Sequence, residues 1–415
     1  MEEERRKILY ISYGGGHANL VRHIYNELSR ICCYEQKVIA LTVAGKVFDG
    51  CGIPYSLIED YIDLFPYKQD ILTYGNELAA LAFRADAGIL YSDLVAYLGI
   101  GFCDLREELG ESEAREAYAE KGRKAFCPVR SMELIIQQEQ PSALVITCGV
   151  RMEKAAGIAA NRLGVPVVRI ADLPVFEDSG CNCITCVMND YGREFANRKL
   201  KVPLSNIVVT GQPVFEDNVK VSKNELEQCR ELIKADRYEK VILYLEQPGL
   251  QETGQVEDYL SRVAEKWNKY LFLIKLHPNQ TQQREEKFPD NMLFLKDYPL
   301  KNLLYICDVA ITRDSTAGME AALVGKPLIT LMLSAADIDY SEYGISIKVD
   351  RLEALEKTIL VCIESDSKEC QQLAKGRETF HNKKSAAANI AEVINEASMS
   401  FKNINLRMAS FKTTF

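Results

Sequence analysis

A glycine-rich turn followed by a histidine is the first segment whose residue types suggest chemistry. The run Tyr13-Gly14-Gly15-Gly16-His17 comes directly after an apolar stretch and directly before a helical pattern. Glycines here let the backbone approach a ligand, and the positive end of the following helix favours an anion or a sugar oxygen. The spacing differs from the dinucleotide fingerprint Gly-x-Gly-x-x-Gly, so no nicotinamide or flavin cofactor is expected. A tight turn without a ligand is the structural alternative.

His17 stands at the predicted start of that helix, where an imidazole can take a proton from an acceptor hydroxyl. We therefore predict that His17 is a catalytic residue on the acceptor side. A hydrogen bond from its ring to a sugar, without proton transfer, is the alternative. The chain has four histidines. His23 falls inside the helical pattern and His381 in a polar stretch, so both are expected to be structural or solvated.

The fourth histidine, His277, follows an apolar strand pattern at 271–276 and precedes Pro278. Open parallel sheets bind ligands beyond the carboxyl ends of their strands. An imidazole at that place can pair with nucleotide phosphates and stabilise the leaving group, so we predict a catalytic role. An ordinary turn at a strand end is the alternative. Glu246 closes another predicted strand, where contact with a ligand and simple strand termination are weighed equally.

The segment 312–320 carries the most specific pattern. It follows an apolar strand, and Asp314, Ser315 or Thr316 can each cap the predicted helix. The N–H groups of its first turn and the hydroxyls form a phosphate site. Glu320 lies four residues after Thr316, on the same helix face, where its carboxylate can accept hydrogen bonds from both ribose hydroxyls. The alternative is a capped amphipathic helix with Glu320 in solvent. The predicted nucleotide-sugar site comprises Gly14, Gly15, Gly16, Glu246, Arg313, Asp314, Ser315, Thr316, Ala317 and Glu320.

The elements that must position these residues alternate short β-rich runs with helical stretches, which is typical of parallel sheets covered on both faces. Six strands are predicted in the first half, at 7–13, 37–43, 142–148, 165–171, 184–189 and 206–211, with a helical insertion at about 55–130. Six more are predicted at 241–247, 271–278, 291–296, 308–313, 327–332 and 346–349. We expect an acceptor domain over 1–219, a donor domain over 220–385, and a helix and tail over 386–415 that can cross back to the first domain.

Composition limits the class of protein. A chain of 415 residues with 47% hydrophobic residues fits two folded domains, and its net charge of -9 argues against nucleic acid as a partner. No signal peptide and no run of eighteen apolar residues is recognised, so a cytoplasmic location is expected, with peripheral membrane association left open. Thirteen cysteines without an export signal are expected to be reduced. For Cys181, Cys183 and Cys186, packing or local thiols are favoured over a metal site.

The motifs resemble those of sugar-nucleotide glycosyltransferases with the GT-B fold. The glycine turn with His17 is similar to theirs, Glu320 precedes Gly325-Lys326-Pro327 by the five residues of their ribose-binding glutamate, and His277 resembles the His-Pro histidine of capsule glycosyltransferases and bacterial sialyltransferases. The resemblance implies α/β architecture, with two Rossmann-like doubly wound domains facing across a cleft. It also implies inverting transfer from a UDP-sugar, or next a CMP-sugar, to a glycan, lipid-linked or small-molecule acceptor. Neither a cofactor nor a metal is required.

Two rival functions use the same donor site. Hydrolysing UDP-GlcNAc 2-epimerases resemble the chain in its C-terminal segment and around 165–174. They carry acids where this chain has Cys148-Gly149-Val150 and Ala171-Asp172-Leu173. The loss of these acids weakens the epimerase or hydrolase interpretation, although Asp172 and Glu177 can substitute for the missing carboxylates. A sensor that binds a nucleotide sugar without turnover is the rival of another class.

Overall fold

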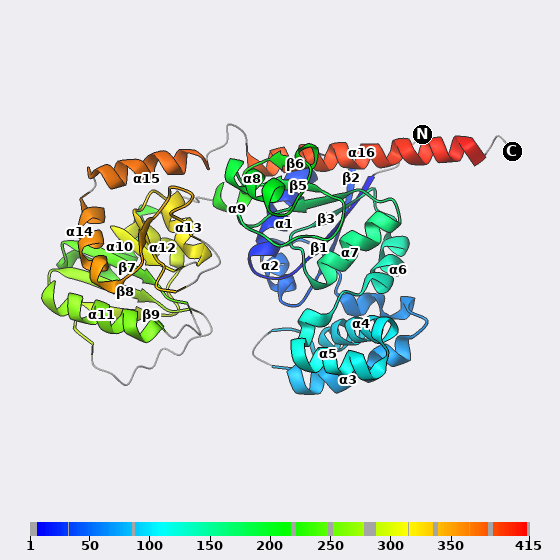
Figure 1. Cartoon of the computed structure of the whole chain (residues 1–415), viewed down its shortest axis with the longest axis horizontal. Coiled ribbons are helices and arrows are strands. Elements are labelled where there is room, and N and C mark those ends of the chain that lie inside the picture. Colours follow the sequence, from blue (N-terminus) through cyan, green and yellow to red (C-terminus); the bar gives the residue numbers. More distant parts are fainter. Residues whose placement is uncertain are drawn as a thin grey trace. The chain divides into compact units, whose positions relative to one another are not determined.

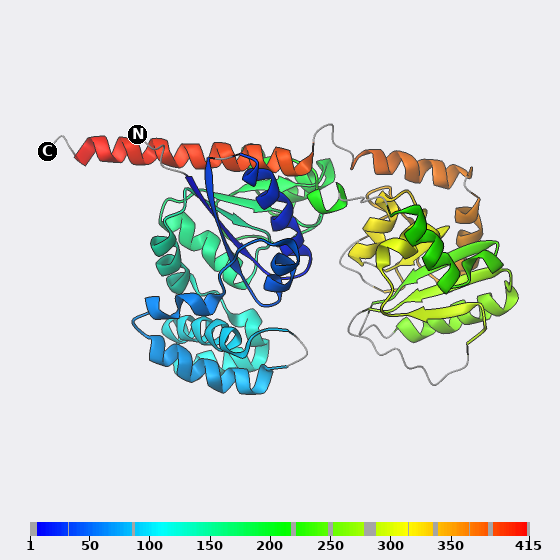
Figure 2. The same ribbon diagram turned by 180° about the vertical axis from the view of Figure 1, so that it is seen from behind.

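The computed structural model describes residues 6–31, 33–84, 88–216, 221–247, 252–277, 288–313, 315–334, 339–364, 366–380 and 385–412. The chain divides into two compact units (Figures 1 and 2). Unit 1 comprises Met1–Glu216 together with Asn382–Phe415, and unit 2 comprises Asp217–His381.

Unit 1 is built on a six-stranded parallel sheet in the order β2-β1-β3-β4-β5-β6. Its strands are β1 (Arg6–Ser12), β2 (Tyr34–Ala40), β3 (Ala143–Ile146), β4 (Val167–Ile170), β5 (Ile184–Val187) and β6 (Ile207–Val209). Successive side chains of a strand point to opposite faces, so Leu9 and Ile11 enter one core while Ile8 and Tyr10 enter the other. Both faces are therefore covered, which explains the nearly continuous apolar runs.

One strand of unit 1 is displaced from its predicted position. The pattern predicts 37–43, whereas β2 runs from Tyr34 to Ala40 because Tyr34 pairs with Arg6 and the ladder continues to the pair Ser12 and Ala40. Thr42, with φ 57°, has left-handed backbone that cannot continue a strand. The predicted strand therefore exists but begins and ends three residues earlier.

Helices cover both faces of the first sheet. They are α1 (Gly16–Ser29), α2 (Ala44–Cys51), α7 (Arg151–Arg162), α8 (Asp190–Arg198) and the short α9 (Pro213–Glu216), with a 3-10 turn η4 (Leu204–Asn206). The last helix, α16 (Ala386–Lys412), also belongs to unit 1 (Figure 1). Its Ile390 and Ile394 are fully buried in the core that holds Ile8 and Tyr10. Asn389 Nδ2 donates to the Thr210 carbonyl at 3.0 Å.

A group of helices fills the predicted insertion and lies together at one end of unit 1 (Figures 1 and 2). It comprises η1 (Ile58–Leu64), α3 (Lys68–Ala82), α4 (Tyr91–Leu109), α5 (Glu111–Lys121), η3 (Gly122–Ala125) and α6 (Val129–Glu139). Helices α3 and α4 are in close contact: a Cβ on Gly75 would lie 2.1 Å from the Val95 carbonyl oxygen, and one on Gly99 would lie 2.0 Å from that of Ile71. Only glycine permits this approach.

Unit 2 has a second parallel sheet, in the order β12-β11-β10-β7-β8-β9. Its strands are β7 (Lys240–Leu245), β8 (Tyr270–Lys275), β9 (Met292–Leu295), β10 (Val309–Thr312), β11 (Leu328–Leu331) and β12 (Ile347–Val349). Its helices are α10 (Lys223–Leu232), η5 (Ala235–Arg237), α11 (Glu252–Lys266), α12 (Leu300–Ile306), α13 (Thr316–Leu323), η6 (Leu352–Ala354), α14 (Leu355–Ile363) and α15 (Lys368–Glu378). Helices α11 and α14 share a core with the strands, α12 contacts β7, and α13 contacts β10. The predicted class of two doubly wound α/β domains is confirmed.

Candidate nucleotide and acceptor sites

Each sheet has one point where the strand order changes direction. In unit 1 the chain runs from β1 outward to β2 and then returns to β3 on the other side, so the switch lies between β1 and β3. In unit 2 the same change falls between β7 and β10. Ligands of doubly wound sheets bind beyond the carboxyl ends of the strands at such points. The glycine turn follows β1, Glu246 follows β7, and Arg313 follows β10, so sequence places the candidates at the two switches.

The glycine turn needs its glycines for two reasons. A Cβ on Gly14 would lie 2.2 Å from Val43 Cγ2 and 2.9 Å from the Val43 carbonyl carbon, so the turn packs directly against the start of α2. Gly15 has φ 67° and ψ -127° and precedes the first residue of α1. No side chain among the described residues caps α1, and its first turn contains no acidic residue. The start of α1 can therefore accept an anion or a sugar oxygen.

A buried carboxylate that the sequence analysis missed holds this turn in place. Glu153, in the first turn of α7, is 0% exposed. Its carboxylate accepts the backbone N–H of Tyr13 at 2.9 Å, of Thr147 at 2.5 Å and of Cys148 at 2.8 Å. These bonds connect the residues after β1 and β3. Glu153 therefore fixes the two strand ends at the switch point of unit 1.

His17 lies beside a second carboxylate that sequence reasoning weighed only in another role. Its Nε2 is 4.0 Å from Asp172 Oδ2, the separation of an ion pair and longer than a hydrogen bond. The side chains of His17 and Asp172 are 26% and 33% exposed, so both are accessible. Burial raises the pKa of Asp172, and the His17 charge opposes that rise. Nδ1 of His17 has no hydrogen-bond partner among the described residues. His17 and Asp172 follow the carboxyl ends of β1 and β4, which lie at the same edge of one parallel sheet. This shared edge is the feature from which the pair could have been predicted.

A buried arginine underlies the loop that carries Asp172. Arg169, in β4, is 2% exposed, and its guanidinium carbon lies 4.8 Å from the centroid of the Phe176 ring. The guanidinium donates to the Glu177 carbonyl, and its Nη2 is 3.8 Å from Glu177 Oε2. Glu177, which is 61% exposed, therefore pairs with Arg169, while Asp172 pairs with His17.

Strand register brings the unit 2 candidates together. Leu245 pairs with Thr312 on one side and with Lys275 on the other. The residues that leave the sheet next, Arg313 and Glu246, are therefore neighbours in one row, and His277 lies two residues beyond the end of β8. Glu246 is 4% exposed, so it is part of the buried edge of this row.

The start of α13 forms the capped helix that sequence predicts. Ser315 is its N-cap, with Oγ accepting from the Ala317 N–H at 3.3 Å, and Thr316 is its first residue. The Ser315 carbonyl accepts from the Tyr340 hydroxyl at 2.9 Å. A Cβ on Gly318 would lie 2.4 Å from Thr312 Cγ2, so the helix packs closely on its own strand. Asp314, the other predicted cap, lies outside the described residues.

Glu320 is one turn into α13 and is partly buried. Burial raises the pKa of Glu320, and no neighbouring charge in the described part of the chain offsets the rise. A partly desolvated carboxylate in this state gains from any ligand hydroxyl that donates to it. The alternative of a fully solvated Glu320 does not fit this burial.

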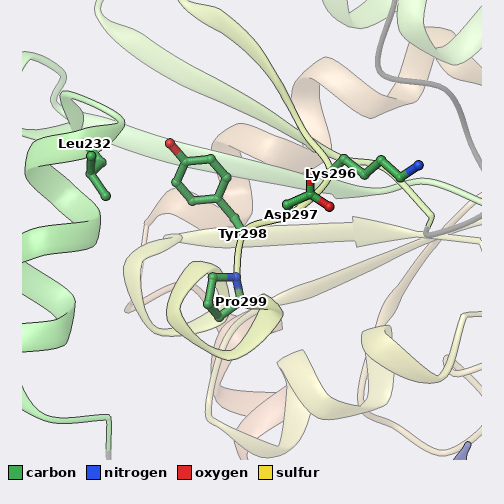
Figure 3. Close-up of a pocket in the computed structure, with 5 residues that line it drawn as sticks. All are labelled: Leu232, Lys296, Asp297, Tyr298 and Pro299. Atoms are coloured by element: carbon green, nitrogen blue, oxygen red, sulfur yellow. The ribbon is translucent and has the colours of Figure 1, made fainter.

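A pocket of about 290 Å³ lies at the outer edge of the same sheet (Figure 3). Residues 296–299, which follow β9, and Leu232 of α10 line it, with the Tyr298 ring directed toward Leu232. Lys275, at the end of β8, donates to the Lys296 carbonyl. This bond connects the sheet edge at β9 with the row that contains Glu246 and Arg313. The pocket contains none of the predicted site residues. No set of three metal-ligating side chains is found in the described ranges.

Comparison with known proteins adds a family model and several solved structures. The model for CDP-Glycerol:Poly(glycerophosphate) glycerophosphotransferase matches residues 175–345. This segment includes the unit 2 candidates and excludes the glycine turn. No curated protein sequence matches the chain. None of the described helices has the length and apolar character to span a membrane.

Similar solved structures include enzymes of two classes. One is the UDP-GlcNAc 2-epimerase from Neisseria meningitidis bound to UDP-GlcNAc, 14% identical, with a TM-score of 0.57 over 95% of this chain and 100% of that chain. Another is the glycotransferase of kitacinnamycin, 11% identical, with a TM-score of 0.62 over 95% and 100%. A third is the glycosyltransferase SnogD from Streptomyces nogalater, 13% identical, with a TM-score of 0.52 over 95% and 100%. At these identities the likeness shows the fold.

Proposed function

Because the chain has the GT-B fold, we propose that it is a glycosyltransferase that moves a sugar from a nucleotide-sugar donor to an acceptor hydroxyl. The observation that carries the proposal is the row at the switch point of unit 2, where the capped start of α13 and the partly buried Glu320 follow β10. UDP is the favoured nucleotide and CMP the next, and no metal takes part.

In this proposal unit 2 holds the donor. The Thr316 N–H at the start of α13 and the hydroxyls of Ser315 and Thr316 bind the phosphates, and His277 donates to them. Glu320 accepts hydrogen bonds from the ribose hydroxyls. As the bond between the anomeric carbon and the phosphate oxygen breaks, its electron pair goes to the departing nucleotide, where these donors stabilise the negative charge.

Unit 1 supplies the acceptor side. The acceptor oxygen forms the new bond to the anomeric carbon, and its proton goes to the imidazole of His17. Asp172, an ion-pair distance from Nε2, stabilises the imidazolium that results. Transfer by this route requires a neutral His17, an ionised Asp172, a bound donor and an acceptor hydroxyl.

Two observations favour transfer over epimerisation. Cys148-Gly149-Val150 supplies no carboxylate at the end of β3. The carboxylate that does lie there, Glu153, is fully buried and accepts three backbone N–H groups, so it is committed to the fold. Asp172 remains as the one acidic side chain beside His17 that the described residues show.

A second candidate is transfer of glycerophosphate, which the matching family model favours through its description. The acceptor oxygen would then attack phosphorus, and the nucleoside monophosphate would leave. The same donors at α13 would stabilise that leaving group, so the two candidates differ in the donor and share the site.

A donor panel tests the proposal. The full-length protein is first heated with UDP, CMP, CDP, GDP and ADP, because a ligand that binds only the folded state raises the Tm. Nucleotide release from UDP-sugars, CMP-sugars and CDP-glycerol is then measured with and without acceptor alcohols and glycans. Acceptor-dependent release from a nucleotide sugar supports glycosyl transfer, and CMP released from CDP-glycerol supports the second candidate. Release without acceptor, or an epimerised product, would contradict both, as would tight binding without turnover.

A further inference from the structure

Two cysteines form a thiol pair in the loop between β4 and β5. Cys181 and Cys183 are separated by Asn182, whose backbone is fixed to α7 by both polar groups: its N–H donates to Asn161 Oδ1 at 2.6 Å, and its carbonyl accepts from Asn161 Nδ2 at 2.9 Å. The side chain of Asn182 accepts from Asn206 Nδ2 at 3.0 Å. The two thiols therefore lie two positions apart on an anchored loop, where they interact with each other.

Polar groups surround the sulfur of Cys183, the more buried of the two cysteines. Cys183 is 7% exposed, and its Sγ lies 3.5 Å from Ser179 Oγ and 3.5 Å from Thr185 Oγ1. The buried Arg169 guanidinium adds a positive charge nearby. The hydrogen bond from Cys181 and those from the two hydroxyls lower the pKa of the Cys183 thiol to about 6, against the effect of burial. The lowered pKa favours the thiolate of Cys183, and the thiolate is the nucleophilic form.

The sulfur of Cys181 is positioned to form a disulfide with Cys183 once Cys183 has been oxidised. Cys181 is partly exposed, and its Sγ packs at α7 where Gly157 leaves room: a Cβ there would lie 2.7 Å from the sulfur. Its hydrogen bond to Cys183 raises the pKa of Cys181, so it keeps its proton while Cys183 is ionised. A low-pKa thiolate next to a second thiol is the arrangement of redox-sensing cysteines.

We propose that Cys181 and Cys183 are a redox-active dithiol that a hydroperoxide converts to a disulfide within the loop. The Cys183 thiolate attacks one peroxide oxygen, the O–O bond breaks, and the protein retains a sulfenic acid while an alcohol or water leaves. The Cys181 sulfur then attacks the sulfenic sulfur, the S–S bond forms, and water leaves. Two thiols are oxidised and one peroxide is reduced. The inference is independent of the transferase proposal, because its products are read on the protein itself.

Peptide mapping tests the disulfide. The full-length protein is treated with hydrogen peroxide, its free thiols are blocked with N-ethylmaleimide, and peptides are analysed without reduction. We expect the peptide with Cys181 and Cys183 to lose two hydrogen atoms, to escape blocking and to regain both thiols with dithiothreitol. Cys181→Ser and Cys183→Ser should each abolish the product. Cys370→Ser is the matched control, because this buried thiol donates to the Val361 and Cys362 carbonyls and should leave the reaction unchanged.

Two further measurements test the dithiol in the unmodified protein. Phenylarsine oxide bridges two adjacent thiols with loss of water, so it should protect Cys181 and Cys183 together from blocking. The rate of peroxide oxidation should rise with pH through about 6, as Cys183 ionises, and should be nearly level by pH 8. A Cys183 that is blocked as readily after peroxide as before, or oxidised to sulfinic acid with Cys181 still free, would overturn the proposal, even if the arsenical bridges the pair.

Discussion

Glu320 is the side chain of unit 2 whose state a ligand should change most. It is partly buried on α13, and its pKa is raised because burial penalises the charged form. Hydrogen bonds from ribose hydroxyls favour the carboxylate and oppose that penalty. Nucleotide binding and ionisation of Glu320 are therefore linked.

The first prediction concerns Glu320→Gln. Replacing the charged acceptor by an amide should weaken ribose hydrogen bonds by about 1 to 2 kcal/mol, or roughly five- to thirtyfold in nucleotide affinity. In the unmodified protein affinity should fall as pH drops below the raised pKa of Glu320, since the protonated acid must ionise before it accepts both hydroxyls. The variant should lose this pH dependence. Calorimetric titration at pH 5 and pH 8 measures both effects.

A control and a ligand analogue complete this test. Glu265→Gln changes an exposed carboxylate just before β8, at the opposite end of the sheet, and should leave affinity unchanged. A 2',3'-dideoxy nucleotide should bind the unmodified protein poorly, and Glu320→Gln should discriminate far less against it. Equal binding of both nucleotides by both proteins would remove Glu320 from the ribose site.

The second prediction concerns the His17 and Asp172 pair. His17→Ala should lower turnover by about a hundredfold or more, the usual scale for loss of a general base, with nucleotide affinity nearly unchanged. Asp172→Asn should lower turnover less, because it removes only the charge that stabilises the imidazolium. Steady-state kinetics with a measured Kd for the nucleotide separates the two effects. Asp178→Asn, on the same loop and exposed, is the control. Normal turnover in His17→Ala would make His17 a peripheral residue.

At the scale of elements, the ends of β1 and β3 depend on one helix. Glu153 extends from α7 to three backbone N–H groups of those two strand ends, and Tyr13 reaches back to α7 through its hydroxyl, which accepts the Met152 N–H at 3.2 Å. The Arg151 guanidinium carbon lies 4.5 Å from the centroid of the Tyr13 ring. The conformation of the glycine turn is thus set from outside the turn.

The third prediction is that Glu153→Gln destabilises unit 1. An amide nitrogen cannot accept a hydrogen bond, so at least one buried N–H loses its partner at a cost of about 1 to 3 kcal/mol. Denaturant unfolding should show that loss in the free energy of unfolding. Glu116→Gln, an exposed change on α5, should unfold like the parent protein. If Glu153→Gln did so too, the carboxylate would have no structural role.

Sequence periodicity was enough to predict the twelve strands, because buried parallel strands carry apolar runs that local reading detects. It also placed the capped start of α13, since Ser315 and the helix it caps are adjacent in the chain. Glu153 was missed, and Asp172 was weighed only as an epimerase carboxylate and not as the partner of His17, for the opposite reason. Glu153 acts on Tyr13 across 140 positions. Such contacts follow from strand order, which periodicity does not specify.

The difference between local patterns and long-range contacts also explains how much of the cysteine cluster could be predicted. The pattern favoured packing or local thiols over metal ligation, and Cys186 is indeed buried within β5. The pairing of Cys181 with Cys183 depends on Asn161 of α7, which fixes the residue between them from a distant part of the chain. Spacing alone gave no sign of that restraint.

At the scale of the whole molecule, unit 2 is one uninterrupted segment with its own sheet and core. The fourth prediction is that residues 217–381, expressed alone, fold and keep nucleotide affinity within a few-fold of the full chain. Calorimetric titration with the nucleotide chosen by the donor panel measures this. A folded unit 2 without affinity, or nucleotide binding by unit 1 alone, would overturn the assignment of the donor.

The fifth prediction is that removing α16 destabilises unit 1 selectively. Ile390, Ala391 and Ile394 fill a core shared with β1, and burial of such side chains contributes about 1.5 to 3 kcal/mol for each large aliphatic one. A chain that ends at 381 should show a lower midpoint for unit 1, while the midpoint of unit 2 stays in place. Calorimetric scanning resolves two transitions, and a common shift of both would contradict the prediction.

The division of unit 1 into two chain segments has a consequence for synthesis on the ribosome. Residues 6–216 emerge first, yet one face of their sheet lacks α16 until residues 386–397 have been translated. Unit 2, which is made in between, can complete its core earlier. In the nascent first half, Ile8 and Tyr10 therefore stay uncovered by α16 until the end of translation. We expect chaperone binding to the growing chain to be strongest in this interval. We therefore expect unit 2 to complete its core before unit 1, although unit 1 is translated first.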